Sequence, residues 1–243
     1  MGDAATTPSA PRATGADPAY LLYTSGSTGP KGVLVGHAAL TQLVGTVHRA
    51  AGATFVERVL ATTTTTFDIS LVELLLPVTT GATCVLADED TVRDPMRLAE
   101  YIAAGRIDFA QATPTLWGAL LEHLQVRIPV TVCAGEPLGG ALRDRLLAAS
   151  GYALNGYGPT ETTVYATLWP LAEGVPVSIG APIAGTTAWV LDCWNRPCAT
   201  GAVGGCSSAG PGCPRATSSA PSSLRRSSST GSRGHPRPGL RHR

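Results

Sequence analysis

Lysine is almost missing from this chain, which has only Lys31 among its 18 Lys and Arg residues. Long apolar runs are missing too: no stretch of about 18 apolar residues occurs, so we expect no transmembrane helix and no membrane partner. The first residues lack an apolar core, so we expect no signal peptide. The six cysteines form no CxxC pair, which predicts reduced thiols rather than a zinc site and favours a cytoplasmic location.

Acidic residues are absent from residues 205–243, although this segment carries seven Arg. It also lacks Ile, Val, Phe, Tyr, Trp and Met and is rich in Ser, Gly and Pro. Such a segment cannot bury enough apolar surface to offset its ordering entropy, so we predict a disordered tail. A basic nucleic-acid-binding tail is the alternative. Because no aromatic side chain is present for base stacking, we prefer an out-of-frame tail and expect no nucleic-acid partner.

Strand-like and helix-like segments alternate through residues 17–204, behind a leader, residues 1–16, that we expect to be flexible. Expected strands cover residues 19–23, 33–35, 58–62, 83–86, 107–110, 129–133, 152–155 and 188–191. One expected helix runs from His37 through Val47, and another is opened by residues 66–70 and runs through Leu75. Further expected helices cover residues 94–104, 115–123 and 140–149. This alternation predicts an α/β fold with a mostly parallel sheet flanked by helices. Ligands of such sheets bind at the carboxyl ends of the strands.

The lone lysine lies in a glycine-rich loop, residues 23–32, that follows the first expected strand. Glycines let a backbone approach phosphates, hydroxyls and backbone N–H groups donate to them, and an ammonium neutralises charge. The loop is not a P-loop of the Walker A type, because Gly32 and not Ser or Thr follows Lys31. A plain Gly/Ser turn is the alternative interpretation.

Three further motifs follow expected strands. Asp68, between Phe67 and Ile69, is either the N-cap of the next helix or a buried carboxylate awaiting a cation, and the pattern does not decide. Residues 155–162 combine a flat aromatic that a purine could stack on, a hydroxyl for a phosphate and the carboxylate of Glu161 for Mg²⁺. Residues 134–137 form a strand-end turn that is a weak signal alone.

Together these motifs, YTSGSTGPKG, FDIS, AGEPL and NGYGPTET, resemble the amino-acid adenylation domains of nonribosomal peptide synthetases, within the adenylate-forming enzymes. The resemblance covers about residues 17–204. It implies that ATP and Mg²⁺ are used to convert an amino acid to aminoacyl-AMP and pyrophosphate. The acyl group then passes to the phosphopantetheine thiol of a peptidyl carrier protein.

The resemblance also implies site roles. Thr160 would reach the α-phosphate, and Glu161 would hold Mg²⁺. The remaining nucleotide-binding residues would be Thr24, Ser25, Gly26, Ser27, Thr28, Gly29, Lys31, Gly135, Glu136, Asn155, Gly156 and Tyr157. Asp68 would pair with the α-ammonium of the substrate, in a pocket also lined by Ile69, Val72, Gln111, Val132, Ala134, Gly156, Val164 and Tyr165. Because Asp68 is the only charge there, we predict a neutral substrate side chain, with Gln111 as a possible hydrogen-bond partner.

The chain departs from the family pattern in its loop, which is one residue short before Pro30, and after Gly204. The family continues there with a Thr-Gly-Asp segment and a small C-terminal domain that supplies a catalytic lysine. We therefore expect a frameshifted fragment that lacks full activity. A nucleotide-binding remnant without turnover is the alternative.

Overall fold

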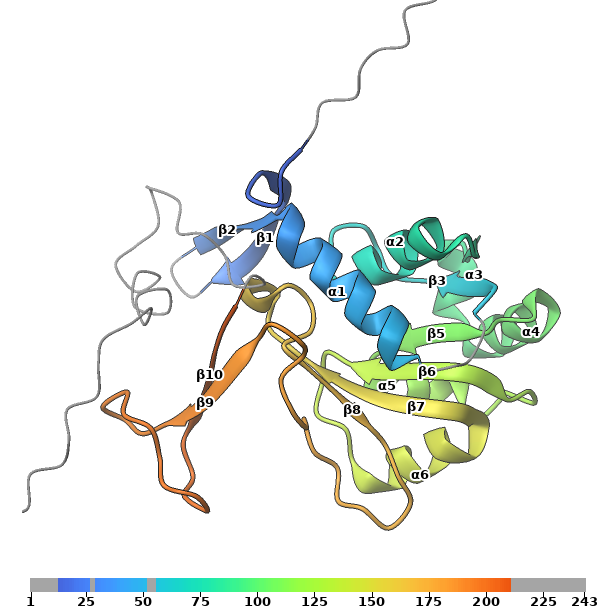
Figure 1. Ribbon diagram of the computed structural model, residues 1–243. Coiled ribbons are helices and arrows are strands. Elements are labelled where there is room, and N and C mark those ends of the chain that lie inside the picture. Colours follow the sequence, from blue (N-terminus) through green and yellow to red (C-terminus); the bar gives the residue numbers. More distant parts are fainter. Residues whose placement is uncertain (1–12, 27–28, 52–55, 211–243) are drawn as a thin grey trace, which may run out of the picture.

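A six-stranded sheet forms the centre of the computed structural model, which describes residues 13–26, 29–51 and 56–210 (Figure 1). Its strand order is β4-β3-β5-β6-β7-β8. Five strands run parallel, and β8 runs antiparallel to β7. This arrangement confirms the predicted α/β fold. The strands are β3 (Arg58–Ala61), β4 (Thr83–Leu86), β5 (Phe109–Ala112), β6 (Ile128–Ala134), β7 (Ser150–Tyr157) and β8 (Thr167–Pro170).

Helices cover both faces of this sheet (Figure 1). On one face α1 (His37–Ala50) and α2 (Ser70–Thr80) share a core with the strands, and on the other α4 (Pro95–Gly105), α5 (Pro114–Leu120) and α6 (Gly140–Ala149) do so. Consecutive residues of a strand face opposite cores. Phe109 packs in the core shared with α1 and α2, and Ala110 packs in the core shared with α4, α5 and α6. This alternation follows from the twofold period of a strand. None of the described helices is long and apolar enough to cross a membrane.

The start of α4 agrees with its capping signal. The Asp94 carboxylate accepts hydrogen bonds from the backbone N–H groups of Met96 and Arg97, at 3.0 and 3.3 Å, and Pro95 occupies the first turn of α4. Strand β8, the short helix α3 (Glu89–Arg93), the single 3₁₀ turn Thr160–Thr162 and the strand at residues 205–209 were not predicted. The predicted strand 107–110 begins two residues too early, because Ile107 packs in the core before β5 starts.

Two antiparallel pairs lie beside the sheet, β1 (Pro18–Gly26) with β2 (Gly29–Gly36), and β9 (Thr187–Leu191) with β10 (Gly205–Ala209). The second pair corrects the expected start of the disordered tail, because residues 205–209 form β10. Backbone hydrogen bonds to β9 order this segment, and they need no apolar side chains. Residues 211–243 lie outside the described residues.

The expected leader needs a similar correction at its end. The Asp17 carboxylate accepts hydrogen bonds from Thr14, and the backbone oxygen of Gly15 accepts one from the N–H of Ala38 at 3.0 Å. Residues 14–16 therefore dock on the start of α1 instead of forming part of a flexible leader. Residues 1–12 lie outside the described residues.

Candidate functional site

The carboxyl ends of β3, β5, β6 and β7 meet at one edge of the sheet, as parallel pairing requires. Three of the predicted motifs follow these ends: Asp68 follows β3, Gly135 follows β6, and the segment from Asn155 to Glu161 spans the end of β7. The fold therefore brings together residues that lie about ninety positions apart in the sequence. Such an edge is where ligands of open α/β sheets bind.

Asp68 has a nearly buried side chain, 5% exposed, in the turn before α2. Ile69 occupies the N-cap position of α2 with no side-chain cap, so the N-cap interpretation of Asp68 is wrong. Burial raises the pKa of the Asp68 carboxyl, a hydrogen bond from the Thr160 side chain lowers it in part, and the nearby charge of Glu161 raises it. Within the described part of the chain Asp68 has no Lys, Arg or His ion-pair partner. A buried carboxylate without a cation is costly, so this position is suited to an added cation.

The loop that carries Thr160 and Glu161 is strained. After a single 3₁₀ turn, Thr160–Thr162, both Thr163 and Val164 adopt positive φ angles of 61° and 64°. Left-handed backbone at a β-branched residue is unfavourable and recurs at functional sites. Gly158 makes the turn possible, because a Cβ there would lie 2.6 Å from the carbonyl oxygen of Val164.

A cavity of about 470 Å³ lies beside this loop. It is lined by the predicted nucleotide residues Gly135, Glu136, Asn155, Gly156 and Tyr157, together with Pro137, Leu138, Gly158, Pro159, Val177, Ser178 and Ile179. Its volume suits a small-molecule ligand. Tyr157 is 40% exposed, so part of its ring is free to stack against a flat ligand. The cavity lies close to Asp68, because Pro159 lines the cavity and the next residue, Thr160, is hydrogen-bonded to Asp68.

Two hydrogen bonds hold the walls of this cavity. The side-chain amide of Asn155 donates to the backbone oxygen of Ser178 at 2.8 Å, which ties β7 to residues 177–179. The Glu136 carboxylate accepts from the N–H and the hydroxyl of Thr115, at 3.1 and 2.6 Å. Glu136 therefore lines the cavity while its carboxylate is bound to the first turn of α5. Sequence reasoning did not assign residues 177–179 to the site.

The glycine-rich loop forms the end of the β1–β2 hairpin, where Thr24 pairs with Lys31 and Gly26 with Gly29. Ser27 and Thr28 lie outside the described residues, and nothing is described of the Ser25 side chain. Burial and the charge of Asp68 raise the pKa of Tyr20, so the base of the hairpin lies near Asp68. The role of Lys31 at phosphates stays a prediction.

The predicted amino-acid pocket is closely packed. Its lining residues other than Gly156 are at most 6% exposed, from Val72 and Val132 at 0% to Ile69 at 6%. The expected free hydrogen bond from Gln111 is not present: its Nε2 donates to the backbone oxygen of Ile69 at 2.7 Å, and its Oε1 accepts from the Tyr165 hydroxyl at 2.9 Å. These internal partners satisfy the amide.

Glu73 is a site-supporting residue that sequence reasoning missed. It is fully buried in α2, and its carboxylate accepts from the N–H groups of Thr62 and Thr63, at 3.0 and 2.9 Å, and from the Thr63 hydroxyl at 2.8 Å. A further hydrogen bond joins Glu73 to the Gln111 side chain. Glu73 thus holds the segment between β3 and Asp68. A lone acid in the run Leu-Val-Glu-Leu-Leu-Leu was the available signal.

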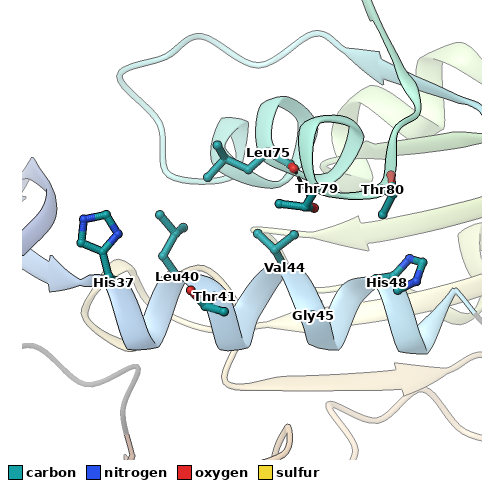
Figure 2. Close-up of a pocket in the computed structure, with 9 residues that line it drawn as sticks. All are labelled: His37, Leu40, Thr41, Val44, Gly45, His48, Leu75, Thr79 and Thr80. Atoms are coloured by element: carbon teal, nitrogen blue, oxygen red, sulfur yellow. Dashed lines mark hydrogen bonds between the residues drawn. The ribbon is translucent and has the colours of Figure 1, made fainter. Parts of the chain in front are cut away.

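A larger cavity, about 670 Å³, lies between α1 and α2 and holds none of the predicted site residues. Figure 2 shows Leu40 and Val44 of α1 directed toward α2, with His37 and His48 near the two ends. Most of its exposed lining is apolar, and the hydroxyls of Thr79 and Thr80 already donate to backbone oxygens of α2. We therefore assign the functional site to the strand-end edge.

The family model described as "AMP-binding enzyme" matches residues 2–215. The chain belongs to the AMP-binding enzymes. Its match extends beyond the predicted 17–204 segment at both ends. Within this family the relatives are nonribosomal peptide synthetases and related proteins, so the chain is part of an adenylation-type domain.

Two curated relatives illustrate the similarity. This AMP-binding chain is 42% identical over 204 residues to a dimodular nonribosomal peptide synthase of Bacillus subtilis (strain 168), which covers 82% of the chain and 8% of the relative. It is 40% identical over 191 residues to novobiocin biosynthesis protein H of Streptomyces niveus, covering 77% of the chain and 31% of that protein. The chain thus spans only a small part of these relatives.

Solved structures of AMP-binding enzymes agree with the fold. A four-domain nonribosomal peptide synthetase bound to AMP and glycine superposes with a TM-score of 0.76 at 33% identity, over 82% of this chain and 15% of that one. A nonribosomal peptide synthetase protein containing adenylation and carrier (PCP) domains gives 0.73 at 27% identity, over 82% and 42%.

Proposed function

We propose that the domain containing this chain activates an amino acid with a neutral side chain. The substrate carboxylate oxygen attacks the α-phosphorus of ATP. A new P–O bond forms, the bond from the α-phosphorus to the bridging oxygen breaks, and pyrophosphate leaves with its electron pair. The products are aminoacyl-AMP and pyrophosphate. Positioning and charge stabilisation supply most of the catalysis in such a transfer.

The observation that carries this proposal is Asp68, a buried carboxylate without an ion-pair partner among the described residues. It is bonded to Thr160, whose chain neighbour Pro159 lines the 470 Å³ cavity. An α-ammonium at Asp68 would thus lie next to a nucleotide in that cavity. Tyr157 would stack on the adenine, and Thr160 would donate to the α-phosphate once the ammonium replaces it at Asp68.

Mg²⁺ would be held by Glu161 together with the phosphates. The described residues contain no group of three His, Cys, Asp or Glu that could bind a metal alone, and Mg²⁺ commonly uses one or two carboxylates plus phosphate oxygens. Bound Mg²⁺ neutralises phosphate charge in such sites. We also propose that a carrier protein with a phosphopantetheine thiol accepts the acyl group, because a structural neighbour combines adenylation and carrier domains.

Calorimetric titration of the full chain tests the proposal. The ligands are AMP, sulfamoyladenosine, and the stable aminoacyl-AMP analogue in which a sulfamoyl group replaces the phosphate and carries a glycyl group. We expect the glycyl group to tighten binding over sulfamoyladenosine, and Asp68→Asn to abolish this gain while AMP binding is retained. The matched control, Glu100→Gln on the exposed face of α4, should keep the gain. If Asp68→Asn also keeps it, Asp68 does not bind the ammonium. ATP–pyrophosphate exchange then separates turnover from binding alone.

A further inference from the structure

Tyr165 is a buried residue linked through Gln111 to the turn that carries Asp68. Its side chain is 1% exposed, and its hydroxyl donates to the Gln111 side chain at 2.9 Å. Gln111 in turn donates to the backbone oxygen of Ile69, the residue after Asp68, at 2.7 Å. The ring is therefore joined through Gln111 to the segment that holds the carboxylate. Burial raises the pKa of Tyr165, and the charges of Glu73 and Asp68 raise it further.

The ring also covers the ends of β6 and β7. A Cβ built on Gly156 would lie 2.8 Å from the Tyr165 Cε1 atom and 3.2 Å from the Cβ of Ala134. Val72 and Val132, both 0% exposed, belong to the same hydrophobic core cluster as Tyr165. The Tyr165 ring thus fills the space beside Gly156, which a long side chain of a bound amino acid would need.

Movement of the ring is restrained on both sides. The backbone N–H of Tyr165 donates to the oxygen of Thr163 at 2.7 Å, within the left-handed turn formed by Thr163 and Val164. At its other end the hydroxyl is held by Gln111. Turning the ring aside would leave the buried Gln111 oxygen without this donor, which is costly.

We propose that Tyr165, fixed by Gln111, restricts the amino-acid site to substrates whose side chain is a hydrogen atom or a methyl group. This inference rests on the proposed function and narrows it. The α-ammonium is bound at Asp68, and the side chain points toward the ring. Overfilling a well-packed pocket is unfavourable, and even one additional methylene group in a binding pocket changes selectivity by about tenfold or more.

Binding of a series of sulfamoyl aminoacyl-adenosines to the full chain, measured by calorimetry, tests the size limit. The series carries glycyl, alanyl, valyl, leucyl and phenylalanyl groups. We expect glycyl and alanyl to bind at least about tenfold more tightly than leucyl and phenylalanyl. Equal binding across the series, or a preference for the large groups, overturns the size limit. The proposed function is still supported in that case if any aminoacyl group tightens binding over sulfamoyladenosine. Loss of binding to AMP and to the whole series overturns both.

Two variants identify the ring as the cause. Tyr165→Ala removes the ring and should shift the preference toward leucyl. Tyr165→Phe keeps the ring volume but loses the restraint from Gln111, so it should still prefer glycyl, by a smaller ratio than the original chain. A general loosening of the fold by Tyr165→Ala would weaken all ligands alike and not change their order, which would count against the proposal. If Tyr165→Ala does not fold, the order measured with the original chain and with Tyr165→Phe still decides.

Discussion

Replacing Glu73 with alanine should destabilise the fold more than replacing any exposed acidic residue with alanine. The change removes a carboxylate that accepts three hydrogen bonds, from the N–H groups of Thr62 and Thr63 and from the Thr63 hydroxyl, and that also bonds to the Gln111 side chain. Gln111 keeps its bonds to Ile69 and Tyr165, so the three threonine donors determine the expected loss. Each buried donor left without a partner costs about 1–3 kcal/mol. Both threonines are half-buried, so water reaches them in part and the lower end applies. We expect the free energy of unfolding to fall by about 3 kcal/mol, which is near the upper end of the effects of ordinary single substitutions.

Urea and thermal unfolding of the full chain measure this loss. The fully buried Trp117, whose indole N–H donates to the Val132 oxygen at 2.9 Å, supplies a fluorescence signal from the core. For a domain of this size about 3 kcal/mol corresponds to a fall in Tm of roughly 6–12 °C. Glu100→Ala, an exposed acid on α4, is the matched control and should change stability by less than about 0.5 kcal/mol.

The variant Glu73→Gln separates hydrogen bonding from charge. Its amide oxygen can accept from both backbone N–H groups, and its amide nitrogen can donate to the Thr63 hydroxyl oxygen. We therefore expect it to lose no more than about 1 kcal/mol. Our account of Glu73 as the residue that holds the segment before Asp68 is refuted if Glu73→Ala and Glu100→Ala unfold alike.

Three further outcomes follow from the geometry. Burial raises the pKa of the Glu73 carboxyl above its ordinary value of 4.5, so the folded state binds the carboxyl proton more tightly than the unfolded state does. The free energy of unfolding of the original chain, measured relative to Glu73→Gln, should therefore fall as the pH rises from 4.5 through the raised pKa. Gly158→Ala places a Cβ 2.6 Å from backbone atoms and should destabilise by about 1–3 kcal/mol, whereas Gly118→Ala, with open space in α5, should stabilise by about 0.5–1 kcal/mol in urea unfolding. Tyr157→Ala should weaken AMP binding by roughly fivefold to a hundredfold in calorimetry, the value of one base–aromatic stack; an unchanged affinity would exclude stacking on Tyr157.

The position of the site was predictable because parallel strands all end at one edge. Once the alternation of strands and helices is recognised, Asp68, Gly135 and Asn155 are expected at the same edge of the sheet. Their proximity follows from the strand order β3-β5-β6-β7, which the sequence pattern does not give. The caps were predictable for a different reason. Asp94 followed by Pro95 carries its own local signal, which does not depend on distant partners.

Partners far apart in the sequence were not predictable. Gln111 seemed available to a substrate, yet its acceptor is used by Tyr165, 54 residues away, and its donor by Ile69, 42 residues away. No periodicity or composition encodes such pairs. Strand β10 was missed for a related reason, because its Ser- and Gly-rich sequence has no strand signal and is ordered by the backbone of β9.

The least predictable feature is the one that gives the site its shape. Local preferences argue against left-handed backbone at Thr163 and Val164, and each such residue costs about 1–3 kcal/mol. The surrounding contacts offset that cost, because the turn is anchored by the Ala166 N–H to the Tyr157 oxygen at 2.8 Å and by the contact with Gly158. Tyr165, which follows this turn, is 1% exposed and lies in the core close enough to Asp68 to feel its charge. A local rule is therefore broken next to the residue that we propose limits the size of the substrate, as expected where function competes with foldability.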